Sequence, residues 1–458
     1  MFLLNHILNK EKISLLLIAF LMVSFNLKAQ EAADTAEHKF NIGGQFRPRV
    51  EFRYGTFRPM NKGEKPAAFI SDRLRLSFEY SYKNLLTLKV APQVVSIWGQ
   101  ANMVQGAENS GNKFSVFEAW AILNATPNWS FKIGRQVISL DDERFFGELD
   151  WAQGARAHDA ISVQFSKKKY ELKGFFAYNQ NYKALYANNM NNPSGNLYST
   201  SDAFPHKWMQ TIWASFPIKD KSKVTLLVNN LGFQQANSAK SDTLDHTTRY
   251  TQTFGANFFH NAKGLSANLA AYYQRGQNLT SKNIQAYMFA AYIGYDIKKQ
   301  WHIGVGSDFV SGNKIGIPIA VNNSFTPYFH TGHKFYGNMD YFYAGNGHKN
   351  AGLSDTYLKL NFKSEKGYSF LMVFHQFVAP YKVMSGAKKY AKNLGQEMDL
   401  SFNYKINKFV AITGGYSFYL ANSTIKYLKD TPTAGIYQQW AWMALNINPT
   451  FYKTKNKH

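Results

Sequence analysis

The feature that most constrains this chain is an alternation of apolar and polar side chains, which begins near residue 40 and recurs to the end. In the first segment the apolar residues share one parity: Phe40, Ile42, Phe46, Val50, Phe52 and Tyr54. The opposite parity carries mostly polar and charged residues. Because a strand sends successive side chains to opposite faces, the pattern predicts a sheet with one apolar and one charged face.

Segments of this kind begin near residues 40, 70, 85, 113, 129, 156, 169, 206, 222, 248, 264, 284, 301, 353, 367, 395, 408 and 437, which gives about 18 strands. Short links such as 82–84 alternate strictly with long ones such as 180–205 and 311–352. A soluble sandwich has no reason to keep loop length in phase with strand number, and a propeller would show a repeated motif. The pattern predicts an all-β fold: a single transmembrane antiparallel β-barrel with short periplasmic turns and long external loops.

Composition agrees with a barrel. Aromatic residues make up 16% of the chain, as expected if they form girdles at both membrane interfaces. The mean hydropathy of −0.35 is low because lipid-facing and lumen-facing residues average out within any window. Cysteine is absent, which excludes disulfides and thiolate metal sites.

The first residues predict export to the outer membrane of a Gram-negative-type bacterium. His6, Lys10 and Lys12 precede an apolar stretch at 13–25, and cleavage is expected after Ala29. We therefore predict a signal peptide at 1–29, a short N-terminal segment at 30–39, the barrel at 40–452 and a basic C-terminal tail at 453–458. The expected partners are outer-membrane lipid and the barrel assembly machinery, and the assembly signal is predicted within 440–451.

The formal net charge of +23 leaves an acidic solute or lipid headgroups as partners, because export excludes nucleic acid. If the alternation holds, the lumen face carries these basic residues: Arg47, Arg49, Arg53, Arg73, Arg75 and Lys89. Glu51 and Glu79 offset only part of that charge. Two interpretations stay open and are compatible: a wall that attracts anions, and a wall stabilised by Arg–Glu pairs.

A second group of mixed charges lies between residues 134 and 159. Its acids, bases and tryptophan predict a constriction loop or salt-bridged lid made of these residues: Asp141, Asp142, Glu143, Arg144, Asp150 and Trp151. A calcium loop lacks its sequence pattern here, and a glycosidase pair has no support beyond the presence of acids. His330 and His333 lack the further ligands that zinc requires. We predict no catalytic residue, metal or cofactor.

The segments RPRVEFRYG (47–55), SDRLRLSFEY (71–80), FEAWAIL (117–123) and DWAQGARAHD (150–159) resemble the alginate export family of outer-membrane porins. The similarity is densest over 45–165 and continues in LSDTYLKLNF (353–362). The resemblance implies a monomeric barrel of 18 strands whose electropositive lumen passes a polyuronate. By motif match it adds Arg135, Arg156 and Asp159 to the lumen or constriction.

The predicted function is therefore passage of anionic solutes, including acidic oligo- or polysaccharides such as alginate, through an arginine-rich pore. Two alternatives remain. An outer-membrane hydrolase would need a compact nucleophile or carboxylate pair at the rim. A plugged barrel that serves as adhesin or scaffold would not conduct.

Overall fold

The computed structural model describes residues 37–99, 113–179, 206–219, 221–233, 248–278, 282–342 and 347–454. The predicted signal peptide, the long loop 180–205 and the last residues of the basic tail lie outside the described residues. Among the described residues, no helix is both long and apolar enough to cross a membrane.

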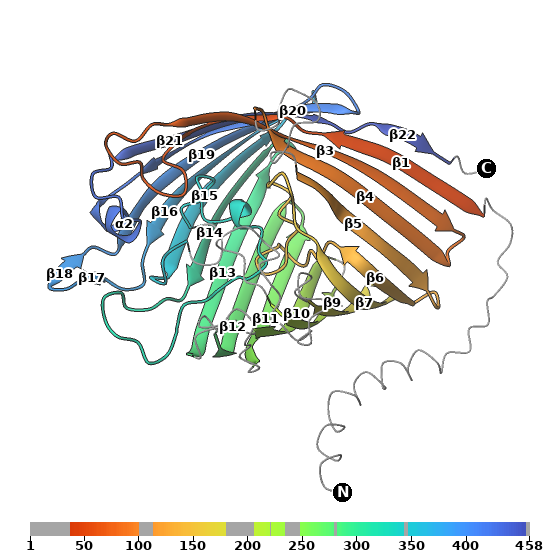
Figure 1. Cartoon of the computed structure of the whole chain (residues 1–458), viewed down its shortest axis with the longest axis horizontal. Coiled ribbons are helices and arrows are strands. Elements are labelled where there is room, and N and C mark those ends of the chain that lie inside the picture. The colour runs from red at the N-terminus through yellow and green to blue at the C-terminus, as the bar shows by residue number, and fades with distance from the viewer. Residues whose placement is uncertain are drawn as a thin grey trace, which may run out of the picture.

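The wall consists of antiparallel strands that follow one another in chain order (Figure 1). Its first half contains β1 (His38–Phe46), β2 (Arg49–Tyr54), β3 (Ala67–Tyr82), β4 (Leu86–Ile97), β5 (Lys113–Asn124), β6 (Trp129–Gln136), β7 (His158–Lys167), β8 (Tyr170–Tyr178), β9 (Trp208–Ile218) and β10 (Ser222–Phe233). Its second half contains β11 (Arg249–Ala262), β12 (Leu265–Gln277), β13 (Asn283–Ile297), β14 (Trp301–Val310), β15 (Leu353–Lys363), β16 (Tyr368–Val378), β19 (Asn393–Lys405), β20 (Val410–Leu420), β21 (Tyr437–Ile447) and β22 (Thr450–Lys453).

The long loops carry the small remaining elements. Strands β17 (Val383–Ser385) and β18 (Lys388–Tyr390) form a hairpin between β16 and β19. The helical turn η2 (Gly332–Lys334) lies in the loop after β14, and helix α2 (Ser423–Leu428) lies in the loop before β21.

The barrel closes between the two ends of the chain. Strand β1 pairs with β22 and β2 pairs with β21, while both β1 and β2 pair with β3 on their other side. The first strand is interrupted at Arg47 and Pro48, where proline offers no backbone N–H to the ladder. The last strand is interrupted in the same way between β21 and β22, so counting β1 with β2 and β21 with β22 reduces the 20 strands of the wall to 18, and the predicted fold is confirmed.

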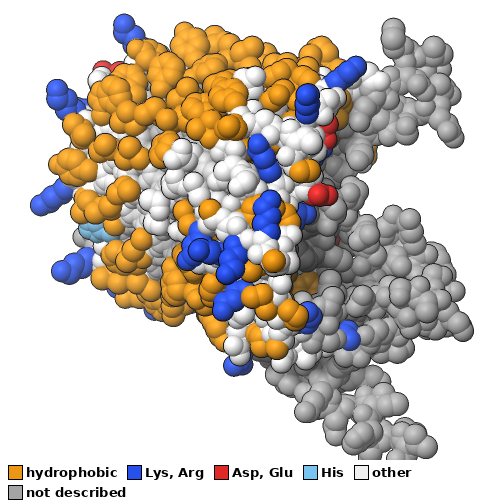
Figure 2. Space-filling model, turned by 90° about the vertical axis from the view of Figure 1, so that its left-hand side faces the viewer, with side chains coloured by type: hydrophobic (Ala, Val, Ile, Leu, Met, Phe, Trp, Pro, Cys, Tyr) orange, Lys and Arg blue, Asp and Glu red, His pale blue; other side chains and the backbone are white. Residues whose placement is uncertain are grey.

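The alternation separates the two faces of the wall. Val50 and Leu74 are 42% and 47% exposed, whereas Arg49 and Arg73, on the opposite parity, are 6% and 0% exposed. Hydrophobic side chains cover much of the outer surface seen in Figure 2. The lipid-facing side is thus apolar, and the charged side chains of these strands point into the barrel.

Two long loops pack inside the barrel against its inner wall. Phe145 and Phe146 from the loop 137–157 form a buried cluster with Phe325, Phe329 and further apolar residues of the loop 311–352. Inward-facing residues of strands between β7 and β21 complete that cluster. Part of the barrel interior is therefore a packed protein core, which narrows the space left for solvent.

Candidate functional site

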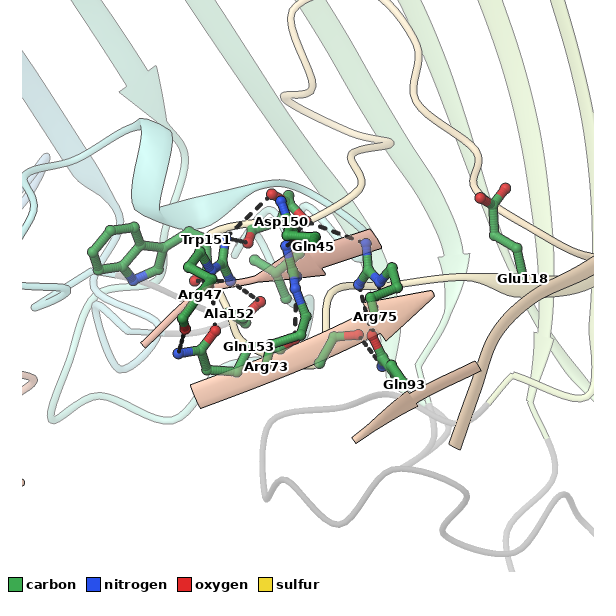
Figure 3. A network of polar contacts seen from close by, with 12 residues as sticks. Gln45, Arg47, Arg73, Arg75, Gln93, Glu118, Asp150, Trp151, Ala152 and Gln153 are labelled. Carbon is green, nitrogen blue, oxygen red and sulfur yellow. Dashed lines mark hydrogen bonds and ion pairs between the residues drawn. The ribbon is translucent and has the colours of Figure 1, made fainter. Parts of the chain in front are cut away.

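Three arginines from the first part of the wall converge on one carboxylate, that of Asp150 in the loop 137–157 (Figure 3). The Asp150 carboxylate lies 3.3 Å from the Arg47 guanidinium, 2.9 Å from that of Arg73 and 3.7 Å from that of Arg75. Its side chain is 40% exposed. One carboxylate cannot neutralise three guanidinium groups, so this site keeps a positive surplus.

Backbone carbonyls of the same loop take up most of the remaining arginine donors. Arg47 donates to the carbonyl of Asp150 at 2.8 Å and to those of Trp151 and Ala152 at 3.3 and 3.2 Å. Arg73 donates to the carbonyl of Gln153 at 3.1 Å. Since a guanidinium has several donors in a fixed plane, each arginine holds several points of the loop. Arg47 and Arg73 therefore anchor the loop to the wall.

Glu51 organises a second group of inward residues. Its carboxylate accepts from Arg49 at 2.9 Å and from Arg53 at 2.8 Å, and it accepts from the Trp440 indole at 3.1 Å. The Arg49 guanidinium also lies 4.1 Å from the centre of the Trp151 ring. The Arg53 side chain is 30% exposed, so its charge reaches solvent although it is paired.

A third group continues along β4, β5 and β6. Arg75 donates to the Gln93 side chain at 2.7 Å and lies 3.5 Å from the centre of the Phe117 ring. Lys89 forms an ion pair with Glu118, which sequence reasoning did not single out. Lys132, also not singled out, lies over the Trp120 ring at 4.0 Å. The cations of the three groups thus outnumber the carboxylates Glu51, Glu118 and Asp150.

The predicted constriction residues join the two inward loops. Arg144 bonds Asp142 at 2.7 Å and pairs with Asp308 on β14. Glu143 lies 3.5 Å from Lys334. These contacts tie the loop 137–157 to the loop 311–352 and to the far wall.

Two further residues of the loop 137–157 strengthen that connection. Trp151 stacks on His333 with 4.1 Å between ring centres. Arg156 donates to the carbonyls of Phe329 and His330. Asp141 accepts from Thr225 at 2.7 Å and from Trp213 at 3.1 Å, which fixes the loop to β9 and β10.

Glu148 lies beside this anchored segment. Burial, together with the nearby charges of Asp150 and Glu143, raises the pKa of Glu148 above its ordinary value. With Glu148 counted as a further carboxylate, the cations of the three groups still outnumber the acids.

The opposite wall carries buried acids that sequence reasoning missed. Asp355 on β15 and Asp399 on β19 lie 2.9 and 3.5 Å from the His375 ring. Asp399 accepts from the Asn338 backbone at 3.1 Å, and Glu397 accepts from the Met339 backbone at 2.7 Å. Asp399 and Glu397 thus hold the loop 311–352 in place. Each acid occupies an inward-facing position in the alternation of its strand, and this alternation could have identified it from the sequence.

Arg135 and Asp159 correct the lumen placement that the resemblance implied. They form an ion pair of 2.8 Å with side chains 44% and 53% exposed. Arg135 shares its strand face with Ile133, which is 57% exposed, while its neighbour Gln136 is buried. Strand alternation therefore directs this pair to the outer face of the barrel.

Glu79 was predicted as an acidic partner of the basic residues on the lumen face. It lies opposite Lys89 in the strand register, but within the described residues the ion pair of Lys89 is made with Glu118.

No group of three or more His, Cys, Asp or Glu suited to a metal ion occurs in the described part of the chain. His330 and His375 are buried, and His333 lies against Trp151.

Comparison of the sequence with protein families shows which family the chain belongs to. Residues 38–430 match the family described as Alginate export. The chain belongs to the Alginate export family. No curated protein matches its sequence.

Solved structures share the fold of this Alginate export family member at low sequence identity. Pseudomonas aeruginosa OccK5 (OpdH) is similar with a TM-score of 0.61 and 8% identity, covering 92% of this chain and 100% of that chain. The outer membrane protein opdK from the same organism gives 0.57 and 11%, covering 90% and 99%. Acinetobacter baumannii OccAB2 gives 0.59 and 9%, covering 92% and 100%. Family and fold together identify an outer-membrane porin.

Proposed function

We propose that this porin passes anionic solutes, with acidic oligo- or polysaccharides such as alginate as the substrate class, and that it works as a monomer without enzymatic activity. The observation that carries the proposal is the surplus of inward-facing cations along β2 to β6. Several of them keep part of their side chain exposed, among them Arg53 at 30%, Lys89 at 23% and Arg75 at 13%.

The arginines divide into two roles in this proposal. Arg47 and Arg73 are 8% and 0% exposed and are bonded to the inward loop, so they position the constriction. Arg53, Arg75 and Lys89 present charge to the open part of the interior. A cleft lined with positive charge raises the local concentration of anions. Because these cations stay partly hydrated, they bind an anion weakly enough to let it move on.

The spacing of the wall suits a chain of carboxylates. In the strand register Arg53 lies opposite Ala67 and Lys89 lies opposite Glu79, so along β3 the exposed cations follow one another in the order Arg53, Arg75 and Lys89. A polyuronate carries one carboxylate per sugar and exchanges contacts along such a row. Replacement of contacts one at a time allows movement without a deep binding minimum.

Single-channel recording with uronate oligomers as blockers tests the proposal. We expect the wild-type current to be interrupted by oligouronates, and the blockade to weaken on the order of tenfold in the double variant Arg53→Gln, Lys89→Gln, which removes two exposed cations. Arg275→Gln is the matched control, because Arg275 shares the outward parity of Tyr273, which is 44% exposed. Equal blockade in all three proteins would overturn the proposal.

A plugged barrel is the second candidate, and the packed core formed by the two inward loops favours it. A plugged barrel that acts as adhesin or scaffold would be folded yet show no conductance in the same recording.

A further inference from the structure

Five of the short periplasmic turns share an unusual residue at one position. The first residue after the strand is a lysine with a left-handed backbone in each of them: Lys83 (φ 47°), Lys168 (φ 57°), Lys219 (φ 61°), Lys263 (φ 51°) and Lys298 (φ 59°). These turns follow β3, β7, β9, β11 and β13. They therefore recur around the rim of the barrel at alternate strand ends.

Backbone preference does not explain lysine at this position. Left-handed φ is strained for most residues, and tight turns normally place Gly, Asn or Asp there. Asn and Asp gain from hydrogen bonds between their short side chains and the local backbone, which lysine cannot make as an acceptor. Lysine at the same strained position in five turns indicates that its charge has a use at this rim.

The ammonium groups are available to a partner. Lys168, Lys219, Lys263 and Lys298 are exposed, and within the described residues none of them forms an ion pair with a carboxylate. Lys83 is the exception, since it lies 2.9 Å from Glu37. Further exposed lysines stand at the same end of the barrel: Lys221, Lys299, Lys366 and Lys408.

Exposed aromatic side chains border these turns on the lipid-facing side. Tyr170, Tyr295 and Trp301 are 50%, 53% and 42% exposed and lie within three residues of a turn lysine. Tyrosine and tryptophan form the girdle of a barrel at the level where the lipid headgroups begin. A lysine just beyond that girdle extends its apolar stem along the wall and places its ammonium among the headgroups.

We propose that the turn lysines form a binding ring for anionic phospholipid headgroups, such as phosphatidylglycerol, in the periplasmic leaflet. The compact ammonium suits a phosphate as a point charge. A membrane fits the observations better than an acidic protein partner, because the lysines are distributed around the rim and stand next to lipid-facing aromatic residues.

The test compares two full-length variants reconstituted in nanodiscs of phosphatidylethanolamine and phosphatidylglycerol. The ring variant carries Lys168→Asn, Lys219→Asn, Lys263→Asn and Lys298→Asn. The control carries Lys382→Asn, Lys388→Asn, Lys389→Asn and Lys392→Asn, four exposed residues in the long loop before β19. Native mass spectrometry measures the ratio of phosphatidylglycerol to phosphatidylethanolamine that stays bound to each barrel.

We expect the bound-lipid ratio to fall on the order of fivefold or more in the ring variant and to remain near the wild-type value in the control. The ring variant should unfold at the same or a higher temperature, because asparagine tolerates the left-handed turn better than lysine. An unchanged ratio in the ring variant, or an equal fall in both variants, would overturn the proposal. Binding of the ring to acidic periplasmic proteins with an unchanged lipid ratio would overturn it as well.

Discussion

At the scale of single residues, Glu51 is the charge on which the inner wall depends most. Its side chain has no exposed surface, and it pairs with both Arg49 and Arg53. Glu51→Gln leaves two guanidinium groups without their shared counter-charge, and we expect a loss of about 3–5 kcal/mol in the free energy of unfolding. Urea unfolding of the folded barrel in detergent measures that loss.

Glu64→Gln provides the matched control for Glu51. Glu64 also pairs with an arginine, Arg58, but both side chains are largely exposed, at 34% and 46%. We expect its loss in the free energy of unfolding to be much smaller than that of Glu51→Gln, since exposed ion pairs contribute little. Equal losses for the two variants would contradict the central role of Glu51.

Asp150 gives a second prediction at this scale. Asp150→Asn removes the one carboxylate shared by Arg47, Arg73 and Arg75, so the positive surplus on the wall increases. We expect the permeability ratio of chloride to potassium to rise, measured from the reversal potential in a salt gradient. A lower ratio would mean that the loop, once released, covers the arginines.

The sequence predicted single residues unevenly. Alternation was sufficient to direct Arg49 and Arg73 inward, and the same rule could have found Asp308 and Asp355, which occupy the inward parity of β14 and β15. The carboxylate that pairs with Arg47 and Arg73 was not predictable in the same way. Asp150 lies about a hundred positions along the chain in an irregular loop, whose path depends on contacts that no local pattern encodes.

At the scale of elements, the two inward loops determine the width of the interior. Trp151 connects them by stacking on His333, and it also packs edge-on against Trp442 of the wall strand β21 at 4.7 Å. Trp151→Ala removes these contacts, and we expect a larger and noisier single-channel conductance. Trp129→Ala is the control, because Trp129 is 39% exposed on the outward face at the turn end of β6.

The strands were the most predictable elements. Each predicted start lies within about three residues of the observed one, because period-two alternation is a local property of the chain. The interruption of the first strand could be predicted from Pro48, and the lengths of the turns could be predicted from the ends of the strands. The inward packing of the loops was only one of the expected alternatives, since an apolar cluster such as Phe145 with Phe329 forms between distant segments.

At the scale of the whole molecule, closure of the barrel depends on its last strand. Tyr452 and Lys453 in β22 stand opposite Ile42 and Asn41 in β1. Deletion of residues 450–458 leaves the edge of β1 without its partner, and exposed strand edges are not tolerated within a membrane. We expect this truncation to lose the heat-modifiable folded band on electrophoresis, whereas deletion of 455–458 alone should retain it.

The account as a whole depends on a net positive interior. The reversal potential of the wild-type barrel in a planar bilayer, under a potassium chloride gradient, measures the selectivity of that interior directly. We predict that the reversal potential of the wild-type barrel has the sign of a chloride-selective pore. In the Arg53→Gln, Lys89→Gln variant this potential should move toward zero. Selectivity for potassium in the wild-type protein would contradict the account.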